Sequence, residues 1–589
     1  MLIFRTPKTY WERIKCIIFK NRKIKIHILA PNKVLTTSLI KGYEYSELGK
    51  KIYQNGNLEL LGKEINISWP PKWETIETGF WPSKMSNKIR YYGNSINMDI
   101  KIIWELHRMQ WLPNVANFAV EEENIELINE ILNIVNNYHN IHPRMYTISW
   151  MEGIEISLRS ISILETLGQI KDIDIESHMI ASIYSSLAEN AEWINNNLSQ
   201  KWRLNNNHLI LELVGLGILG FSLHWHPKSN LWRDRAKRIL DIELEKQTFN
   251  GRNWEPTTAY HRFVCEALIM FTHYLNQNEK FKCPITDRIL NKTEEIADSL
   301  IWLLDNDKKI PLIGDDDAGI VIPRKSTVDC RDTSEVIEAM NRINLKIDKN
   351  KKRGVRVWND HGMGVMKNDK WHIHLTSGAP NGIARQGSHR HLDMLSLTLN
   401  LDGEDILKDS GTGVYFSMPQ WRDYFRHEKM HSGIRMEGKK WGEVVDLFEI
   451  KNPVLGHIDI INDNELMARL DLDNENSPSR KVSMTEIGIT IEDTLLITNP
   501  VITFVLDKEV DIKISKNEII IEKDNWIIYH SPPPMKYSKR CEFVIPSLES
   551  KPDEKTATIS SGYGNYQQGT IIDLFHVSGT VARTKIVKK

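Results

Sequence analysis

The sequence predicts an α+β protein of more than one domain, in which an all-helical part precedes an antiparallel β part. Two hydrophobic periods carry this prediction. From about residue 98 to residue 310 apolar residues recur at three- and four-residue spacing, and from about residue 355 they alternate with polar ones. A run of helices followed by a run of strands favours separate helical and β parts over a mixed βαβ sheet.

The helical period is clearest in three segments, each of which gathers apolar side chains on one face of an amphipathic helix. These segments are Ile125–Val135, Ile154–Leu167 and Leu209–Leu219. Breaks rich in Asn, Pro and Gly separate the helices at intervals that suit helical hairpins. The breaks are Asn140–Pro143, Trp225–Asn230 and Asn250–Pro256.

The strand period begins at Trp371–Leu375 and Leu395–Leu401, where Ile and Leu alternate with His, Ser, Thr and Asn. Similar stretches follow at Asp511–Ser515, Glu518–Glu522 and Thr570–Phe575. The predicted domains are an irregular N-terminal segment at residues 1–95, a helical domain at residues 96–350 and an antiparallel β domain at residues 351–589.

Composition narrows the function classes. The 589 residues hold 76 Lys and Arg against 77 Asp and Glu, so the net charge of −1 gives no general attraction to nucleic acid or to an anionic membrane. Five scattered cysteines argue against a disulfide framework and against a structural zinc knot. The 18 Trp and 17 Tyr residues suit either core packing or the stacking of carbohydrate rings.

Targeting signals are not evident in the sequence. The apolar run Cys16–Phe19 is too short for the core of a signal peptide, and no stretch approaches the 18 apolar residues of a transmembrane segment. We therefore expect a protein without a transmembrane segment that is cytoplasmic or exported by a non-classical route. The oligomeric state stays open, a dimer included.

Two clusters at predicted helix starts carry candidate chemistry. Asn205–His208 precedes an apolar helix, where asparagines cap helices, and amide and imidazole groups also neutralise a carboxylate in a cleft. Trp254–His261 opens another helix and contains Tyr260. A tyrosine in a polar cleft serves as general acid or base when neighbouring cations tune its pKa, whereas most single tyrosines simply pack.

Two further clusters lie in the β part. His389 and His391 fall on one face of the segment Ser388–Asp393, a placement that suits metal binding or paired acid and base work. Asp409 and His431 add oxygen and nitrogen ligands to His391, which together form a plausible zinc set. The acidic run Gly314–Gly319 resembles a calcium loop only loosely, because it lacks the downstream glutamate.

The order of these clusters resembles the heparinase II/III-like polysaccharide lyases, a superfamily that includes alginate-type lyases. Seven pieces match in order across about residues 100–435: Trp104–Gln110, Trp150 with Glu155 and Arg159, Asn206–His208, Glu255–Arg262, Gly314–Gly319, His389–Ser396 and Asp409–Thr412. The resemblance implies an incomplete (α/α) toroid joined to a C-terminal antiparallel β-sandwich. It agrees with the division into helices and strands that the two periods predict.

The resemblance also implies β-elimination at a uronic acid of an acidic polysaccharide. A neutralised carboxylate acidifies the proton at C5, a base removes it, and an acid protonates the leaving oxygen at C4. By position, Asn207 and His208 correspond to the residues that neutralise the carboxylate. Tyr260 corresponds to the tyrosine that acts either as the acid or as both acid and base. His389 corresponds to the histidine base. Arg262 or Arg159 is expected to lower the pKa of Tyr260.

Further roles follow from the same resemblance. Substrate contacts are implied for Arg159, Glu255, Tyr424 and Arg426. One structural zinc or calcium ion is implied at His391, Asp409 and His431, and no organic cofactor is expected.

Two features depart from the family pattern. His431 is followed by Ser-Gly where relatives have Asn-Thr, which bears on metal binding. Arg390 stands between the paired histidines where a small residue is common, and a cation there is expected to narrow the cleft or to bind an extra acidic group. The missing export signal fits an enzyme that acts on a bacterial surface polysaccharide or its intracellular intermediates.

Two other function classes stay open at this stage. A glycoside hydrolase on a toroid fold would use two carboxylates, for which Glu212, Glu255 and Asp316 are available. A non-catalytic glycan-binding protein in polysaccharide assembly would share the fold without the chemistry. Elimination leaves an unsaturated uronate in the product, and hydrolysis does not.

Overall fold

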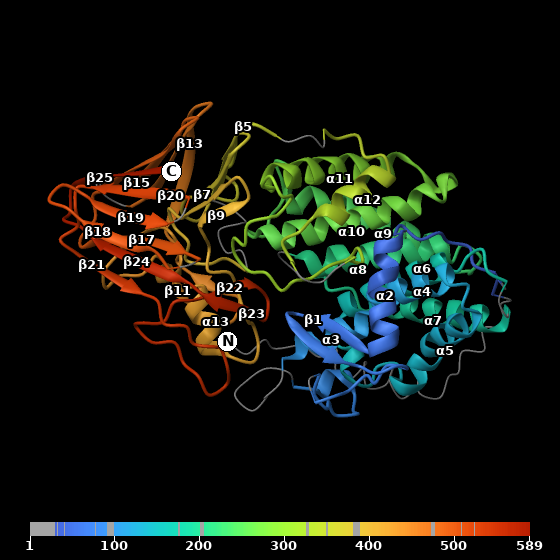
Figure 1. The fold of residues 1–589 in the computed structure, drawn as a ribbon. Helices are drawn as coiled ribbons and strands as arrows, with labels where there is room; N and C mark the ends of the chain where they lie inside the picture. The colour runs from blue at the N-terminus through green and yellow to red at the C-terminus, as the bar shows by residue number, and fades with distance from the viewer. Residues whose placement is uncertain are drawn as a thin grey trace.

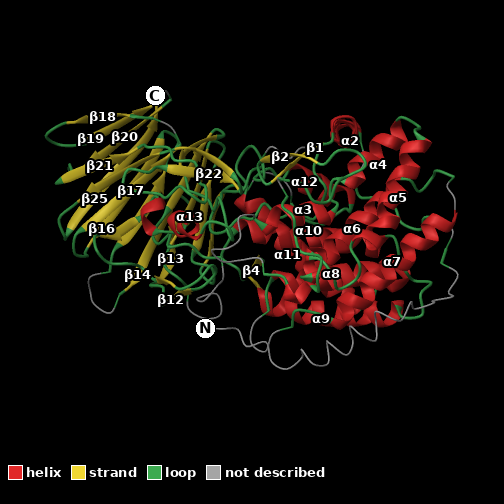
Figure 2. Ribbon diagram, turned by 90° about the horizontal axis from the view of Figure 1, so that it is seen from below, coloured by secondary structure: helices red, strands yellow, loops and turns green. Residues whose placement is uncertain are grey.

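The computed structural model describes residues 30–589 except 32, 41, 77, 91–98, 175–176, 201–204, 326–328, 349–351, 381–388, 473–476, 508 and 524. Helices occupy one side of the molecule and strands the other (Figures 1 and 2). The helices are α2 (Tyr43–Asn55), α3 (Ile100–Arg108), α4 (Leu112–Glu121), α5 (Ile125–Ile141), α6 (Gly153–Gln169), α7 (Ser177–Asn196), α8 (Asn207–Ser222), α9 (Ser229–Gln247), α10 (Thr258–Asn276), α11 (Pro284–Leu303) and α12 (Ser334–Arg342).

The helical part has two layers, as the burial of its helices shows. In α6, 16 of 17 residues are buried, and in α8 every residue but His208 is buried, whereas α5 buries six of 17 along one face. Helices apolar on all sides belong inside, and amphipathic ones outside. Accordingly α4, α6, α8 and α10 pack side by side as an inner arc, with α5 on α7 and α9 on α11 outside. This arrangement confirms the predicted incomplete toroid.

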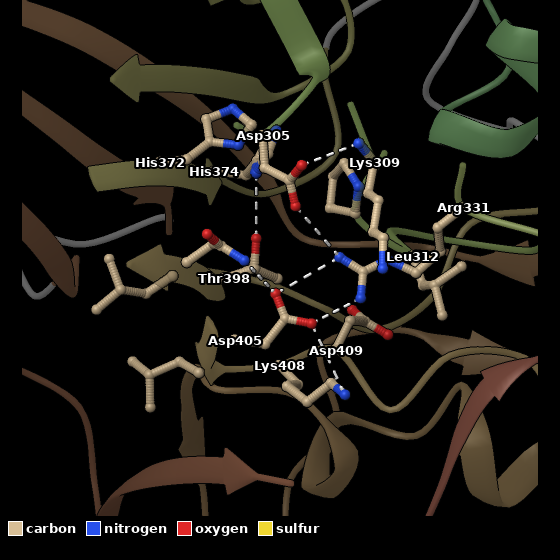
Figure 3. A pocket seen from close by; sticks show the side chains of 14 residues that line it. Asp305, Lys309, Leu312, Arg331, His372, His374, Thr398, Asp405, Lys408 and Asp409 are labelled. Atoms are coloured by element: carbon tan, nitrogen blue, oxygen red, sulfur yellow. Dashed lines mark hydrogen bonds and ion pairs between the residues drawn. The ribbon is translucent and has the colours of Figure 1, made fainter. Parts of the chain in front are cut away.

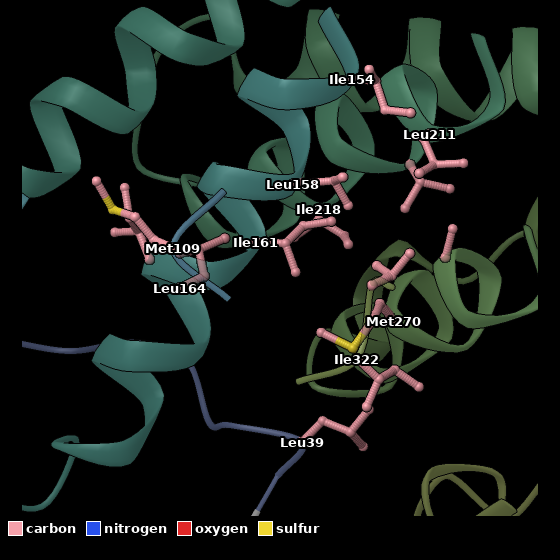
Figure 4. Packing of buried hydrophobic residues seen from close by; sticks show 14 of the residues in the cluster. Leu39, Met109, Ile154, Leu158, Ile161, Leu164, Leu211, Ile218, Met270 and Ile322 are labelled. Atoms are coloured by element: carbon pink, nitrogen blue, oxygen red, sulfur yellow. The ribbon is translucent and has the colours of Figure 1, made fainter. Parts of the chain in front are cut away.

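Close packing of branched and long aliphatic side chains holds the layers together. Figure 4 shows Ile154, Leu158 and Ile161 of α6 near Leu211 and Ile218 of α8, and all of these side chains are nearly or completely buried. Gly215 allows this approach, because a Cβ there would lie 2.5 Å from the Cβ of Ser157. Dense packing of this kind fixes the inner helices, and with them the side chains at their N-termini.

The N-terminal region adds to the helical part. Helix α2 packs against α4, and a short hairpin of β1 (Asn57–Leu60) and β2 (Lys63–Asn66) follows it. A second hairpin, β3 (Thr248–Phe249) with β4 (Arg252–Asn253), connects α9 to α10. No helix in the described ranges is long and apolar enough to cross a membrane.

The β part contains three larger antiparallel sheets. The first has the order β5-β6-β7-β8-β9, the second β10-β17-β24-β21, and the third β13-β14-β15-β16-β25-β20-β19-β18. Their bounds are β5 (Gly354–Trp358), β6 (Met363–Lys367), β7 (Trp371–Thr376), β8 (Leu397–Leu401), β9 (Glu404–Leu407), β10 (Ile434–Met436), β13 (Leu455–Asn462), β14 (Glu465–Asp471), β15 (Ser479–Met484), β16 (Gly488–Leu495), β17 (Pro500–Leu506), β18 (Asp511–Ile514), β19 (Ile519–Lys523), β20 (Trp526–Ser531), β21 (Lys536–Arg540), β24 (Thr570–Phe575) and β25 (Thr580–Lys588).

The sheets share one core. Alternate residues of the long strands point inward, as in β16 and β14, and the inner side chains of all three sheets form one hydrophobic cluster. The small hairpin of β11 (Glu443–Val444) and β12 (Ile450–Lys451) contributes Ile450 to this core. Helix α13 (Pro419–Phe425) and the hairpin of β22 (Thr558–Gly562) and β23 (Asn565–Gln568) lie outside it. The predicted antiparallel β-sandwich is confirmed.

Charged side chains join the two parts. Arg331, which precedes α12, donates to Asp405 of β9 over 2.6 Å, and Lys367 Nζ of β6 donates to the carbonyl oxygen of Leu304 over 2.9 Å. Both bonds connect the end of the helical part with the first sheet. The candidate functional residues lie along the same boundary.

Candidate active site

Tyr260 and His389 come from opposite sides of this boundary and stack on each other. Their ring centroids are 4.2 Å apart with planes inclined by 22°, and the side chains are almost completely buried. Tyr260 lies in the first turn of α10, whose N-cap Thr257 accepts from the Tyr260 amide and donates to the carbonyl oxygen of Asp315 over 2.6 Å. The helix start therefore fixes the tyrosine beside the loop that contains Asp315.

Asp315 is the centre of the site. Its carboxylate accepts hydrogen bonds from His389 Nδ1 and His391 Nε2, both over 2.9 Å. It also accepts two bonds from Arg422 of α13, over 2.5 and 2.6 Å. Burial raises the pKa of Asp315, but Arg422 and the two histidines outweigh burial and hold the pKa well below its usual value. A buried, ionised carboxylate therefore orients both histidines.

The bond to Asp315 also selects the tautomer of His389. A carboxylate only accepts, so Nδ1 carries the hydrogen, and Nε2 of the neutral ring has a free lone pair. That Nε2 lies 3.6 Å from Glu255 Oε1. A histidine held in this way is suited to accept a proton at Nε2, as in other carboxylate-oriented histidine bases.

The backbone at Gly314 and His389 is closely packed against neighbouring segments of the chain. His389 has φ +75° and Gly314 φ +70°, and the Asp315 amide donates to the His389 carbonyl over 3.0 Å. A Cβ on Gly314 would lie 2.8 Å from the carbonyl oxygen of Pro256. Only glycine fits here without displacing the chain that holds Tyr260 and His389.

Asn207 and Glu255 form a second unit of the site. Asn207 Nδ2 donates to both carboxylate oxygens of Glu255, over 3.1 and 2.9 Å, and its backbone amide donates over 3.2 Å. His208, the next residue of α8, is only partly buried. The structure thus brings the predicted residues Asn207, Glu255 and His389 together, and the side-chain amide of Asn207 is bonded to Glu255.

Tyr260 keeps its proton in this environment. Its hydroxyl lies 3.4 Å from that of Tyr415, and burial, together with Asp317, Asp315 and Glu255, raises its pKa well above the usual value. The expectation that Arg262 or Arg159 lowers this pKa is wrong. Arg262 donates to the carbonyl oxygens of Cys330 and Gly319, and Arg159 donates to that of Ser149.

Three predicted substrate contacts are engaged inside the protein. Arg159 is completely buried and lies over the rings of Tyr138 and Trp150. Tyr424 donates to the carbonyl oxygen of Thr556 over 3.2 Å, and Arg426 donates to that of Leu447 over 3.1 Å. In this arrangement these side chains hold helices and loops in place, and their substrate roles remain predictions.

The predicted metal ligands lie together. Ligand atoms of His391, Asp409 and His431 are all within 4.8 Å of one another, and all three side chains are buried. His431 Nδ1 donates to Asp409 over 2.9 Å, while His391 Nδ1 and His431 Nε2 have no partner in the described structure. Two imidazoles held by carboxylates, each with a free nitrogen, are the expected arrangement of metal-binding histidines. The residues therefore fit a divalent metal ion.

The carboxylates that were considered for a hydrolase accept hydrogen bonds within the protein. Glu212 accepts from the amide and hydroxyl of Ser199, both over 2.6 Å, and Asp316 accepts from the Ala318 amide over 2.7 Å. Glu255 faces Asn207 and His389 instead. The geometry does not support the two-carboxylate alternative.

A small cavity of about 30 Å³, large enough for about one water molecule, lies next to Asp409 of the predicted metal site. It is lined by three cations, three carboxylates and two histidines of β7, and Asp409 is on its wall (Figure 3). Arg331 and Asp405 pair within it. Three cations face three carboxylates, so the charges of the lining are balanced. The lining residues come from the end of the helical part and from the first sheet, so the cavity lies at the boundary between the two parts.

Sequence reasoning missed Asp315, Arg422 and Tyr415. Asp315 belongs to the acidic run that was compared with a calcium loop, and the three adjacent aspartates give no signal that separates one from another. Arg422 lies four residues before Arg426, which was chosen instead. Tyr415 follows Asp409–Gly413 closely, and this proximity is the one sequence signal that could have identified it.

Comparisons with known proteins identify the family and the fold. Residues 62–324 match the family "Heparinase II/III N-terminus", and residues 350–476 match "Heparinase II/III-like, C-terminal". No curated protein sequence matches the chain at a significant level.

Solved structures with the same fold include three lyases. A heparinase III has 13% identity and a TM-score of 0.64, and the alignment covers 98% of this chain and 89% of that one. The heparan sulfate lyase HepC from Pedobacter heparinus has 14% identity and a TM-score of 0.56, with 93% and 84% covered. A chondroitin AC lyase from Streptomyces coelicolor A3 has 9% identity and a TM-score of 0.51, with 82% and 74% covered. The two family matches, in order and over both domains, show that the chain belongs to the heparinase II/III-like polysaccharide lyases.

Proposed function

We propose that this enzyme cleaves a glycosaminoglycan-type polysaccharide at a uronic acid by β-elimination. The observation that carries the proposal is the stacked pair of Tyr260 and His389, in which the histidine is oriented by Asp315 and the tyrosine keeps its proton. Solved structures of the same fold are named as lyases of heparan sulfate and chondroitin, which supports this substrate class.

The arrangement favours a division of roles within the pair. His389 Nε2 takes the C5 proton as base, the C4–O bond breaks as the C4–C5 double bond forms, and the Tyr260 hydroxyl protonates the leaving oxygen. The raised pKa of Tyr260 suits a group that is protonated at the start of the reaction. Asp315 stabilises the imidazolium that forms on His389.

The developing charge on the substrate carboxylate needs hydrogen-bond donors. Asn207 and His208, at the start of α8, are the proposed donors. To bind the substrate carboxylate, the Asn207 side chain exchanges its hydrogen bonds to Glu255 for bonds to the substrate. We assign a structural zinc ion to His391, Asp409 and His431, because imidazole nitrogens suit zinc better than calcium. When bound, the ion supplies a positive charge that holds these three side chains together.

The test is the ultraviolet absorbance of unsaturated uronate released from heparan sulfate, chondroitin sulfate, hyaluronan, alginate and polyglucuronate. Wild-type enzyme should produce it on at least one glycosaminoglycan, and Tyr260→Phe should lower kcat by about 10²- to 10⁴-fold. His389→Ala should do the same. Tyr537→Phe, at an exposed tyrosine of β21, is the matched control.

Reducing ends without absorbance would contradict elimination and indicate hydrolysis. Absorbance on alginate or polyglucuronate alone would contradict the substrate class. The hypothesis that the natural substrate is a bacterial surface polysaccharide is tested by including acidic glycans from the source organism in the same assay.

A further inference from the structure

Arg252 and Arg390 are buried cations without a carboxylate partner. Arg252, on β4, is completely buried, and Arg390, between the two histidines, is 7% exposed. Among the described residues neither guanidinium forms an ion pair. Arg252 Nε and Nη2, Arg390 Nε and the neighbouring Asn253 Nδ2 have no hydrogen-bond acceptor there.

The contacts that these guanidiniums do make are weak ones. Arg252 Nη1 donates to the sulfur of Met363 over 2.8 Å, and its guanidinium carbon lies 5.4 Å from the Trp358 ring centre. Arg390 Nη2 donates to the carbonyl oxygen of His361 over 3.4 Å. A thioether, an aromatic face and one long bond do not replace the hydration that two charged groups lose on burial.

Several other buried arginines of this chain have carboxylate partners. Arg108 donates to Glu155 over 2.8 Å, Arg480 to Asp493 over 2.7 Å and Arg422 to Asp315 over 2.6 Å. Arg159 forms no ion pair in the described structure, but it lies over the rings of Tyr138 and Trp150. The protein thus pairs several of its buried guanidiniums with a carboxylate. The absence of compensation at Arg252 and Arg390 points to a partner that comes from outside the chain.

The two arginines form one cluster. His361 connects them, because its Nε2 donates to the carbonyl oxygen of Asn253 over 2.7 Å and its own carbonyl accepts from Arg390. Burial first, and then the charge of Arg390, lower the pKa of Arg252 to about 9. The carboxylate that acts on Arg390 is Asp393, at longer range than an ion pair.

The cluster lies beside the active site along the chain. Asn253 accepts from the Glu255 amide over 3.1 Å, and Glu255 contacts Asn207 and His389. Arg390 is bonded directly to His389. A group bound here is therefore a close neighbour of the reacting sugar.

We propose that Arg252, Arg390 and Asn253 form a binding site for a small oxyanion of the sulfate type. Guanidinium groups and a side-chain amide supply N–H donors that sulfate oxygens accept, and two cations match its two negative charges. The anion is either a sulfate group of the polysaccharide or free inorganic sulfate. The site itself does not depend on the proposed function, but the polysaccharide source does.

Sulfate binding is read from thermal unfolding in sodium sulfate and in sodium chloride of equal ionic strength. The wild-type Tm should rise with sulfate to a plateau. Arg252→Met and Arg390→Met, which keep the side-chain length, should lower the affinity for sulfate at least about tenfold. Arg583→Met, which removes an exposed arginine paired with Glu492, should respond like wild type.

Two results would overturn the site: a wild-type Tm that responds equally to both salts, or a sulfate response that survives in both methionine variants. If a methionine variant does not fold, Arg252→Lys and Arg390→Lys replace it. Lysine keeps the charge but loses the planar fork of donors, so the affinity should still fall.

The source of the anion is decided by kinetics on heparan sulfate and on its unsulfated counterpart. A polysaccharide source predicts that Arg390→Met raises KM on the sulfated polymer only and that inorganic sulfate competes with it. A free anion predicts equal KM changes on both polymers. A protein that binds sulfate but eliminates no polysaccharide would contradict the proposed function and leave the oxyanion site intact.

Discussion

The Asp315 network and the Arg252–Arg390 cluster lie next to each other but treat buried charge in opposite ways. Around Asp315 one carboxylate satisfies Arg422, His389 and His391 at once. At Arg252 and Arg390 three guanidinium nitrogens have no acceptor in the described structure. Buried charge is favourable only when it is paired. The charges of the first region are therefore paired within the protein, whereas those of the second region are left for the proposed anion.

Removal of the central carboxylate should have the largest effect. Asp315→Ala leaves the buried Arg422 without its carboxylate partner, so we expect a loss of about 3–5 kcal/mol in the free energy of unfolding, measured by urea titration. Asp369→Ala, at an exposed ion pair with Arg353, is the control and should change little. A loss below about 1 kcal/mol in Asp315→Ala would show that the network is not the scaffold described.

The proposed metal site shares His391 with the Asp315 network. Zinc at a hundredfold excess over its Kd should raise the free energy of unfolding by about 2.7 kcal/mol, because it binds only the folded triad. His431→Ala should abolish this stabilisation, while His457→Ala, at a partly exposed histidine of β13, should not. Equal zinc protection in the two variants would contradict the assignment of the ligands.

Histidines that are buried without a carboxylate partner should make the free energy of unfolding depend on pH. Burial lowers the pKa of His374 and of His530 to about 3, so both are neutral in the folded state. Below pH 6.5 the unfolded chain binds protons that the folded chain does not. The free energy of unfolding should therefore fall by about 1.4 kcal/mol per pH unit for each histidine between about pH 6 and 4.

Urea titrations across this pH range measure the slope. His374→Gln should reduce it by the contribution of one histidine. An unchanged slope in that variant would contradict the account.

The smallest effect is expected at the unpaired cluster. In sulfate-free buffer Arg390→Met should raise the free energy of unfolding by about 1 kcal/mol, because it removes a buried charge that forms no ion pair among the described residues. Arg422→Met removes a paired charge and should lower it instead. Urea titration of both variants decides, and equal losses would show that Arg390 is compensated within the protein.

The fold could be predicted because its pattern is local. A helix such as α8 is apolar on all sides, and strands such as β8 alternate strictly, so element type follows from spacing. Domain boundaries are less visible. Helix α2 and the β1–β2 hairpin lie in the stretch predicted as irregular, where few apolar residues repeat.

The site was predictable in part. Motifs identified Tyr260, His389 and the His391–Asp409–His431 triad, which the structure brings together. The role of Asp315 could not be predicted, because the three adjacent aspartates have different partners. Asp315 accepts hydrogen bonds from the histidines, Asp316 accepts from an amide of its own loop, and Asp317 pairs with Lys101.

Which arginines are buried could not be predicted from the sequence either. Arg159 and Arg426 were predicted as substrate contacts from their positions in the sequence; both side chains are buried in the structure, and their substrate roles stay predictions.

The ion pair between Asp315 and Arg422 also bears on the order in which the protein forms. The helical domain leaves the ribosome first, with Asp315 lacking the cation that lies 107 residues further along the chain. Until the first sheet and α13 have been synthesised, this carboxylate must stay hydrated, and the loop around it cannot close. The stacked pair of Tyr260 and His389 is therefore assembled late, after both parts of the chain have been synthesised.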